Sequence, residues 1–467
     1  MRTHAFWRRI AAAGLLGLST TPTPGRAEPP GKPNIVFILA DDLGYADVGC
    51  MGSRFYHTPN IDRLAAEGMR LTNFHQSQNC APTRACLMSG QYAPRTGVYT
   101  VGSLNRGRPE DRRMIPPANV TQLPLDRKTI ADQLKDAGYV TGMFGKWHLG
   151  NQGDHHPARR GFDEAIVVEG DHFGFRTIPP SEVPAGGYDG DWITDRALAF
   201  IEKHKDRPFF LYVPHRLVHS PFQAKPGMAE KYEKRPPAGG QNNPTYAAMI
   251  ESLDESVGRI IAQLDRLRLT SRTVVVFTSD NGGIGSYREA GADNVTDNAP
   301  LRGGKGQLYE GGLRVPMIVR WPGVTPPGSS SAALGIHVDL YATFLEIGGA
   351  GRPPQPIDGV SLTPVLRDPS ARLEREAVYS HFPGYLEGYG KPRWRTTPVG
   401  MVIAGEWKLL EFYEDARFEL YHLGEDLGEN RDLAGRHPEK VAALSAKLAA
   451  WREELKAAMP ATRPAAP

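Results

Sequence analysis

The sequence predicts an α/β fold: a large, mostly parallel sheet between layers of helices, followed by a smaller C-terminal α+β domain on an antiparallel sheet. Residues 34–40, 209–213 and 273–278 are apolar runs without alternation. Such runs are typical of strands that are buried on both faces of a parallel sheet. Helical patterns separate these runs along the chain, as this architecture requires.

Three helices are predicted between and after these strands. The first begins near Pro59, with Thr58 as its cap, and ends at Gly68. The second covers 130–137. The third covers 246–267 and carries apolar residues at helical spacing along one face, which indicates a helix that packs on the sheet.

The C-terminal part has a different pattern. Short strands are predicted at 378–379, 401–403, 407–410 and 419–421, and an Ala-rich helix begins at Pro438. We therefore expect a catalytic domain over 34–374 and an α+β domain over 375–456. The Ala/Pro-rich tail, 457–467, is predicted to be disordered.

The N-terminus resembles an export signal. Arg2, Arg8 and Arg9 precede a short apolar run at 10–18, and Ala27 ends a small-residue cleavage pattern. We expect a signal peptide over 1–27, a linker over 28–33, and export to the periplasm or the extracellular space. The arginine pair leaves two export routes open, and no segment is predicted to span a membrane.

Composition narrows the classes of function. The 55 basic and 52 acidic residues of this 467-residue chain give a net charge of +3, too small to indicate a nucleic acid or an anionic membrane as partner. Only three cysteines are present, so the protein is not a disulfide scaffold. A Cys50–Cys86 bridge is left open, because sequence does not give their separation.

The segment 80–84, Cys-Ala-Pro-Thr-Arg, is the most informative motif. Cys80 opens a predicted helix and Arg84 follows one turn later. The first turn of a helix stabilises anions through its free N–H groups and the helix dipole. Taken alone, the motif also fits a buried structural cysteine beside a turn proline.

Oxygen-bearing side chains follow two of the predicted parallel strands. Asp41 and Asp42 end the first strand, and Asp280 and Asn281 end the third. Ligands of α/β sheets lie at the carboxyl ends of the strands. An all-oxygen set favours Ca²⁺ or Mg²⁺ over zinc, so these four residues are candidate metal ligands.

Basic residues recur in glycine-rich segments. Lys146 and His148 lie within 145–150, Lys305 lies between glycines, and His219 follows the second predicted strand. Together with Arg84 they supply the positive charge and the proton donors that a tetrahedral oxyanion needs. His215 lies close to His219, so either could supply this histidine; His219, which Ser-Pro follows, is preferred, and His215 is kept as a candidate subsite residue.

These motifs, in this order, resemble the type I sulfatases of the alkaline phosphatase superfamily, in the arylsulfatase and N-acetylgalactosamine-6-sulfatase group. The resemblance covers nearly the whole chain after the signal. It rests on residues 34–44, 58–62, 80–84, 145–150, 279–282, 301–306, 310–316 and 419–421. Position 83 is Thr where Ser is frequent, and it keeps the hydroxyl.

The resemblance implies the chemistry. Cys80 would be oxidised by a maturation enzyme to formylglycine (3-oxoalanine), whose hydrate attacks sulfur and later expels sulfate. Ca²⁺, with Mg²⁺ as the alternative, would be held by residue 80 and the four oxygen-bearing side chains. Arg84 and Lys146 would orient the hydrate. Lys305 and His219 would bind sulfate and assist the leaving alcohol, and His148 would remove a proton.

The resemblance also implies the substrate class and its rivals. A sulfated carbohydrate is expected, with galactose- or N-acetylgalactosamine-type 6-sulfates as the first expectation and small sulfate esters as further substrates. The C-terminal domain and the loops around 169–172 and 381–385 are expected to border the leaving-group pocket. The alternatives are a phosphodiesterase or phosphonate monoester hydrolase of the same superfamily, or a sulfated-glycan-binding protein with unmodified Cys80.

Overall fold

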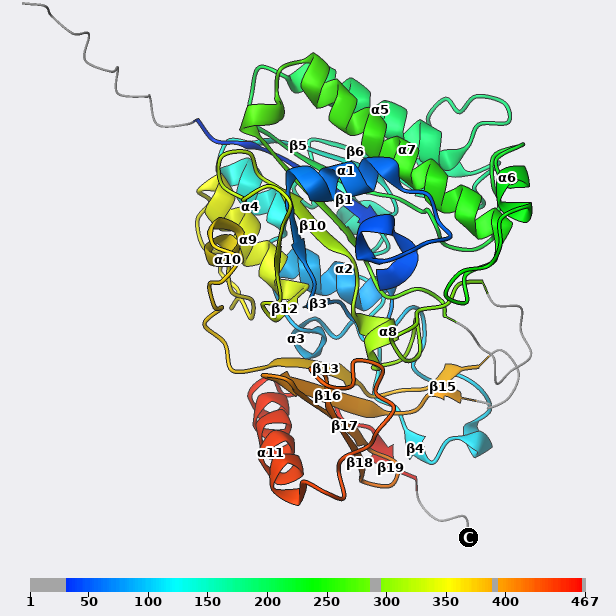
Figure 1. Ribbon diagram of the computed structural model, residues 1–467. Helices are drawn as coiled ribbons and strands as arrows, with labels where there is room; N and C mark the ends of the chain where they lie inside the picture. The colour runs from blue at the N-terminus through cyan, green and yellow to red at the C-terminus, as the bar shows by residue number, and fades with distance from the viewer. Residues whose placement is uncertain (1–30, 286–294, 389–393, 464–467) are drawn as a thin grey trace, which may run out of the picture. The chain divides into compact units, whose positions relative to one another are not determined.

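A nine-stranded sheet forms the centre of the computed structural model, which describes residues 31–285, 295–388 and 394–463 (Figure 1). In spatial order its strands are β11 (Ser329–Ser331), β2 (Met69–Leu71), β10 (Met317–Arg320), β9 (Thr273–Ser279), β1 (Asn34–Ala40), β8 (Phe209–Pro214), β5 (Val140–Gly145), β6 (Glu164–Glu169) and β7 (Arg176–Ile178). The five strands from β9 to β6 pair in parallel, whereas β10 and β7 run antiparallel to their neighbours. The three strands predicted from apolar runs are β1, β8 and β9, so the mostly parallel sheet is confirmed.

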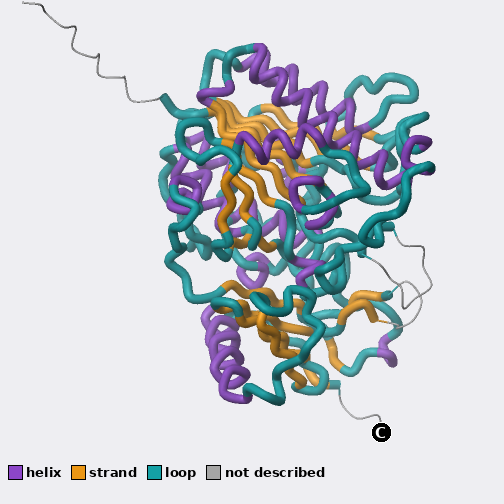
Figure 2. The backbone as a smooth tube through the Cα atoms, in the orientation of Figure 1, coloured by secondary structure: helices purple, strands orange, loops and turns teal. Residues whose placement is uncertain are grey.

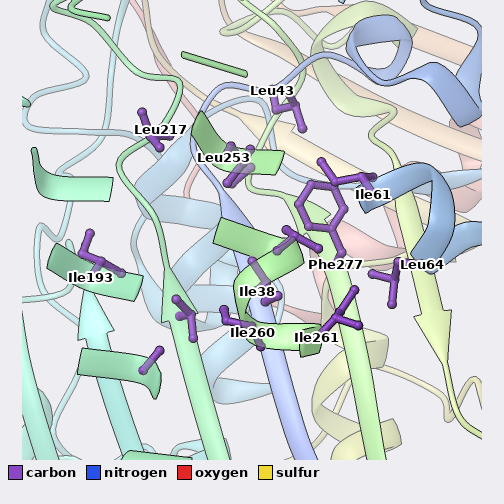
Figure 3. Packing of buried hydrophobic residues seen from close by; sticks show 14 of the residues in the cluster. Ile38, Leu43, Ile61, Leu64, Ile193, Leu217, Leu253, Ile260, Ile261 and Phe277 are labelled. Atoms are coloured by element: carbon purple, nitrogen blue, oxygen red, sulfur yellow. The ribbon is translucent and has the colours of Figure 1, made fainter. Parts of the chain in front are cut away.

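Helices cover both faces of this sheet, as the purple and orange segments of Figure 2 show. One face carries α1 (Pro59–Glu67), α5 (Asp189–His204) and α7 (Pro244–Arg266), and the other carries α2 (Cys80–Ser89), α4 (Ile130–Asp136) and α9 (Val338–Gly348). Successive side chains of β1 point to opposite faces. Ile38 therefore packs against α1 and α7 in the first core (Figure 3), while Phe37 packs in the second core.

The bounds of α1 are as predicted, with Thr58 at the cap position, Pro59 in the first turn and Gly68 after the last. The Thr58 side chain caps no helical amide, because its hydroxyl accepts the N–H of Gly49 at 2.8 Å. The carboxylate of Asp254, on α7, instead accepts the N–H groups of Asn60 and Ile61 at 3.0 and 2.8 Å. A packed neighbouring helix thus supplies the charged acceptor for these amides.

The predicted C-terminal antiparallel sheet is confirmed. It consists of β13 (Val378–Phe382), β16 (Val399–Ala404), β17 (Trp407–Phe412) and β18 (Arg417–His422), with α11 (Pro438–Glu454) packed against it. Its core also includes Cys86 of α2, and the chain from Lys32 onward forms one compact unit. The boundary near residue 374 thus separates two sheets, and the domain limits stay predictions.

Short elements complete the described chain. They are the strand pairs β3 (Phe74–His75) with β12 (Gly335–Ile336), β14 (Leu386–Glu387) with β15 (Trp394–Thr396) and β4 (Met114–Ile115) with β19 (Ala461–Thr462), and the helices α3 (Ala93–Thr96), α6 (Glu230–Glu233), α8 (Glu310–Leu313) and α10 (Thr363–Arg367). The pairing of β19 corrects the prediction of a disordered tail for its described part, because the backbone of β4 offers it hydrogen bonds. Residues 464–467 lie outside the described chain.

Two further expectations concern the N-terminus and the cysteines. The predicted signal peptide, 1–27, lies outside the described residues, as do residues 28–30 of the linker. Within the described residues, no helix is both long and apolar enough to cross a membrane. All three cysteines are free thiols, so the Cys50–Cys86 bridge is not formed; Cys50 packs against the first core and Cys86 lies in the third.

Candidate active site

The four oxygen-bearing residues meet at the carboxyl ends of two neighbouring strands. β1 and β9 are paired in register up to Ala40 and Ser279, so the residues that follow them are adjacent. The Asp42 N–H donates to Asp280 Oδ1 at 3.2 Å, and Asn281 Nδ2 donates to Asp42 Oδ1 at 2.9 Å. All four side chains are buried. The predicted cluster is therefore present.

The cluster has the chemistry of a site for a hard cation. Asp41 Oδ1 and Asn281 Oδ1 are buried acceptors to which no group of the described residues donates a hydrogen bond. Buried acceptors of this kind are costly unless a ligand satisfies them. Atoms of Asp41, Asp42, Cys80 and His219 lie within 4.8 Å of one another. The residues present thus fit a divalent cation such as Ca²⁺, to which carboxylate and amide oxygens are suited.

The backbone at Asp42 supports this interpretation. Asp42 has φ of 66°, in the left-handed region that residues other than glycine seldom adopt. His148 has φ of 64°, so two site residues share this strained geometry. Such strain persists where the surrounding structure fixes it, and it is frequent at functional sites.

Three cations pair with the three carboxylates. Arg84 Nη2 lies 2.7 Å from Asp280 Oδ2, Lys146 Nζ lies 2.5 Å from Asp41 Oδ2, and Lys305 Nζ lies 2.7 Å from Asp42 Oδ2. Burial alone would raise the pKa of Asp41, but the positive charges, led by that of Lys146, outweigh it and hold this pKa well below its usual range. Asp41 therefore stays ionised, whereas burial, followed by the negative charge of Asp41, raises the pKa of Asp280 to about 7.

Cys80 begins α2 beside this cluster and is fully buried. The Thr83 hydroxyl, one turn on, accepts the N–H of Ser77 at 3.0 Å and fixes the chain that enters the helix. Burial raises the pKa of the Cys80 thiol, against the opposing charges of Lys146 and Lys305. An unmodified Cys80 is therefore a thiol rather than a thiolate, and a poor nucleophile.

Lys146 and His148 follow the end of β5, where the chain passes close to β8. At Gly145, φ is 136° and a Cβ atom would lie 2.0 Å from Pro214 O, so only glycine fits. Burial, followed by the charges of Lys146 and Arg84, lowers the pKa of His148 well below its usual value. His148 is thus a neutral, half-buried imidazole whose buried Nδ1 has no hydrogen-bond partner within the described structure.

A pocket of about 490 Å³ opens over Cys80. Cys80, His148, His219 and Lys305 form its inner end. Its other described lining residues, which sequence reasoning missed, are Asn79, Thr100, Val101, Arg106, Gly306, Leu386, Glu387, Gly388 and Arg395. They come from loops and from the short strands β14 and β15, which show no periodic pattern in the sequence, so no signal identified them.

Comparison with known proteins settles the family. A sequence model described as Sulfatase matches residues 33–350. The chain belongs to the sulfatase family. A second model, described as N-sulphoglucosamine sulphohydrolase, C-terminal, matches residues 304–457. The protein is therefore a sulfuric ester hydrolase, and the resemblance drawn from its motifs is confirmed.

Individual relatives agree with this assignment. A sulfatase of Formosa agariphila is 32% identical, over 90% of this chain and 88% of its own length. The N-acetylgalactosamine-6-sulfatase of Canis lupus familiaris is 34% identical, over 77% of this chain and 70% of its own length. The crystal structure of Ps i-CgsB in complex with k-i-k-neocarrahexaose superposes with a TM-score of 0.75 at 28% identity, covering 90% of this chain and 92% of that one.

In this sulfatase the segment after β8 separates its two histidines. His219 lines the pocket, and its Nε2 lies 3.7 Å from Asp42 Oδ2. His215 is buried with its Nε2 2.8 Å from Ser256 Oγ, and it does not line the pocket. The expectation that His215 is a subsite residue is therefore wrong, since the chain turns its side chain toward α7.

His219 is held by residues that the sequence did not reveal. His172 Nε2 donates to the carbonyl oxygen of His219 at 2.7 Å, and His172 Nδ1 lies 2.9 Å from Asp189. Both residues are fully buried. They support the sulfatase pocket from behind, and no motif marks them.

Of the segments expected to border the pocket, only those in the C-terminal part do so. Around 169–172 no residue lines it, and His172 lies behind His219. Around 381–385, His381 contacts Tyr413 and the carbonyl oxygen of Ala458, while the directly following residues 386–388 line the pocket, as does Arg395. The expectation is therefore confirmed for the C-terminal segment and wrong for the first loop.

Proposed function

We propose that this sulfatase removes sulfate from sulfated carbohydrates, using formylglycine at position 80 and a bound Ca²⁺ ion. One observation carries the proposal: Cys80 begins a buried helix beside acceptors without donors and three fixed cations, at the inner end of a pocket. A tetrahedral anion at that point would meet concentrated positive charge.

Residue 80 is the proposed nucleophile after oxidation by a maturation enzyme. Because burial keeps the thiol protonated, the unmodified side chain is poorly suited to attack sulfur. The oxidised residue, once hydrated, supplies an oxygen nucleophile and the means of releasing sulfate. The cations Lys146 and Lys305 lie close enough to influence its charge.

Asp41, Asp42, Asp280 and Asn281 are proposed to hold the cation. Ca²⁺ fits best, and Mg²⁺ is the alternative, because every ligand is an oxygen. When bound, the ion supplies Lewis-acid stabilisation of a sulfate oxygen. Both oxygens of Asp280 already accept hydrogen bonds, from Arg84 and from the Asp42 backbone, so Arg84 fixes the orientation of this ligand.

The remaining polar residues are assigned by their charge states. Burial opposes the charge on Lys305, but the neighbouring Asp42 raises its pKa above the usual value, so it binds a sulfate oxygen as a stable cation. Arg84 and Lys146 orient residue 80. His148 is neutral and accepts a proton from it. His219 presents its ring to the leaving oxygen from the pocket wall.

A sugar substrate is favoured by the pocket and by the relatives. The pocket volume falls within the range of small-ligand sites. One relative is an N-acetylgalactosamine-6-sulfatase, and one structural neighbour was crystallised in complex with k-i-k-neocarrahexaose. We propose a galactose- or N-acetylgalactosamine-type 6-sulfate as substrate and, from the N-terminal pattern, export to the periplasm or beyond the cell.

The test is an ester comparison with enzyme made with and without a maturation enzyme. N-acetylgalactosamine 6-sulfate, its 6-phosphate and a phosphonate monoester are assayed side by side. We expect sulfate release to be fastest and to require maturation. Faster cleavage of the phosphate or phosphonate would favour the rival hydrolase. Sugar binding without turnover, after maturation, would favour the binding protein.

A further inference from the structure

The outer wall of the pocket carries a fixed arginine that the proposed chemistry does not use. Arg106 lines the pocket and is half-buried. Its Nε donates to Ser103 O at 3.0 Å, and its Nη2 donates to Val101 O at 2.8 Å. Neither the hydrogen bonds nor the ion pairs of the described residues involve its Nη1. One edge of the guanidinium is thus held by the loop, which leaves the other edge for a ligand.

The loop that carries Arg106 is itself held in place. The Asn119 side chain accepts the N–H groups of Tyr99 and Thr100 at 2.9 and 3.2 Å and donates to Gly102 O at 2.6 Å. Arg112 Nη1 donates to Arg106 O at 3.0 Å. The cation is therefore positioned before a ligand arrives, which reduces the entropy lost on binding.

Arg106 differs from the cations beside residue 80 because no carboxylate of the described residues pairs with it. Arg84, Lys146 and Lys305 each contact a carboxylate. Arg106 has no carboxylate within 4.0 Å in the described parts of the chain. The lining also contains Arg395, whose Nη1 donates to Lys305 O at 2.7 Å, and one acidic residue, the exposed Glu387.

We propose that the pocket takes a sugar with two anionic groups: the sulfate ester beside residue 80 and a second anion bound by Arg106. This inference rests on the proposed function and narrows its substrate class. The planar fork of an arginine suits a sulfate or a carboxylate equally. The substrate class is therefore an oligosaccharide whose neighbouring group is a second sulfate or a uronate carboxylate.

The test compares three disaccharides: one with a single 6-sulfate, one with a second sulfate on the neighbouring sugar, and one with a uronate neighbour. For each we measure kcat/KM in the matured enzyme and in Arg106→Met. We expect the matured enzyme to prefer at least one dianionic substrate by about 10- to 100-fold, as a charge-assisted contact would give. Arg106→Met reduces this preference to within about threefold of unity, and added salt weakens it in the parent only.

Two variants separate charge from loop structure. Arg108→Met removes an exposed cation two residues away that pairs with Asp111 at 3.0 Å and does not line the pocket. We expect it to keep the preference. Glu387→Gln removes the negative charge from the pocket wall and should increase the preference. An equal loss in Arg108→Met and Arg106→Met, or an unchanged preference in Arg106→Met, would overturn the assignment.

Binding distinguishes failure of this inference from failure of the proposed function. In Cys80→Ala protein, calorimetric affinity for the dianionic and monoanionic sugars does not depend on turnover. We expect the same preference there, and its loss when Arg106→Met is added. Turnover of the monosulfated sugar together with equal affinity for all three sugars would refute the second anion site alone. Neither binding nor turnover of any of them would refute both.

Discussion

Two buried clusters of charge differ in how completely their groups are paired. The active-site cluster contains Asp41, Asp42, Asp280, Arg84, Lys146 and Lys305. The other, called here the bracing cluster, contains His75, Glu310, Arg314, Lys408 and Glu429. All members of both clusters are buried except Lys305, which is partly exposed. In the described residues each cluster has a buried oxygen without a hydrogen-bond donor, but Glu429 Oε1 of the bracing cluster lies 2.8 Å from Lys408 Nζ, whereas the active-site cluster, with Asp41 Oδ1, reaches a pocket lined by Lys305.

The bracing cluster satisfies its central carboxylate internally. Glu310 contacts Lys408 at 2.9 Å, Arg314 at 2.6 Å and His75 at 3.1 Å. Lys408 also lies 2.8 Å from Glu429. These residues join β3 and α8 to β17, and so connect the C-terminal sheet to the preceding part of the chain. Buried charge therefore marks a functional site only where its pairing is incomplete and a ligand has access.

Removing the nucleophile should have the largest effect. Cys80→Ala keeps the volume of a small buried side chain, so we expect a folded protein. Its kcat/KM for a sulfated sugar should fall by about 10⁴-fold or more, because no group remains to attack sulfur. Circular dichroism checks the fold. Turnover within tenfold of the parent would remove residue 80 from the mechanism.

Removing the bracing cation should affect stability instead of chemistry. Lys408→Met leaves Glu310 and Glu429 buried with less compensation, which we expect to lower the free energy of unfolding by about 3–5 kcal/mol. Urea unfolding measures it. Lys447→Met, which breaks an exposed pair with Glu376, is the control and should leave the midpoint nearly unchanged. A midpoint shift as small as the control's would contradict a bracing role.

Removing an active-site cation should instead affect the rate of the reaction more than the stability of the protein. We expect Lys305→Ala to lower kcat for a sulfate ester by about 10²- to 10³-fold, since a charged contact to the transition state is lost. The loss of the Asp42 pair should be offset in the metal-bound enzyme. A mild kinetic effect combined with a large loss of stability would place Lys305 in the same class as Lys408.

Chelation sharpens the contrast further. EDTA should lower both activity and the melting temperature. An ion whose free concentration is 100 times its Kd stabilises the native state by about 2.7 kcal/mol, and chelation removes this contribution. The same shift should appear in Lys408→Met, whose change lies outside the site. Readdition of Ca²⁺ restores both properties. Unchanged activity and stability after verified removal of metal would exclude the proposed site.

The smallest expected effect is the dependence of stability on pH that is due to His215, the buried histidine after β8. Burial lowers the pKa of His215 to about 3, so between that value and about 6.5 only the unfolded state binds its proton. Stability due to His215 is thus present above pH 6.5 and is lost as pH falls, by about 1.4 kcal/mol per pH unit. Between pH 6.5 and 5, the free energy of unfolding of His215→Gln, measured with urea, should fall less steeply than that of the parent protein. Equal slopes would contradict this.

Local patterns explain why much of the fold was predictable. The runs that form β1, β8 and β9 are apolar without alternation because both of their faces are covered by helices. This pattern can be recognised from consecutive residues alone. The residue pairs 41–42 and 280–281 could be predicted to lie together because adjacent parallel strands end at the same edge of a sheet.

Contacts between distant segments explain what was missed. The Asp254 cap of α1, the support of His219 by His172, and the position of Arg106 all depend on packing between segments far apart in sequence. Loop residues also carry no periodic pattern, so the lining beyond the catalytic end of the pocket could not be derived from the chain alone.

The most direct test of the account is the mass of the tryptic peptide that ends at Arg84, taken from enzyme that is actively releasing sulfate. We predict that residue 80 carries an aldehyde or its hydrate in place of the thiol, in a fraction that matches the active fraction. Full activity with an unmodified Cys80 thiol would contradict the account.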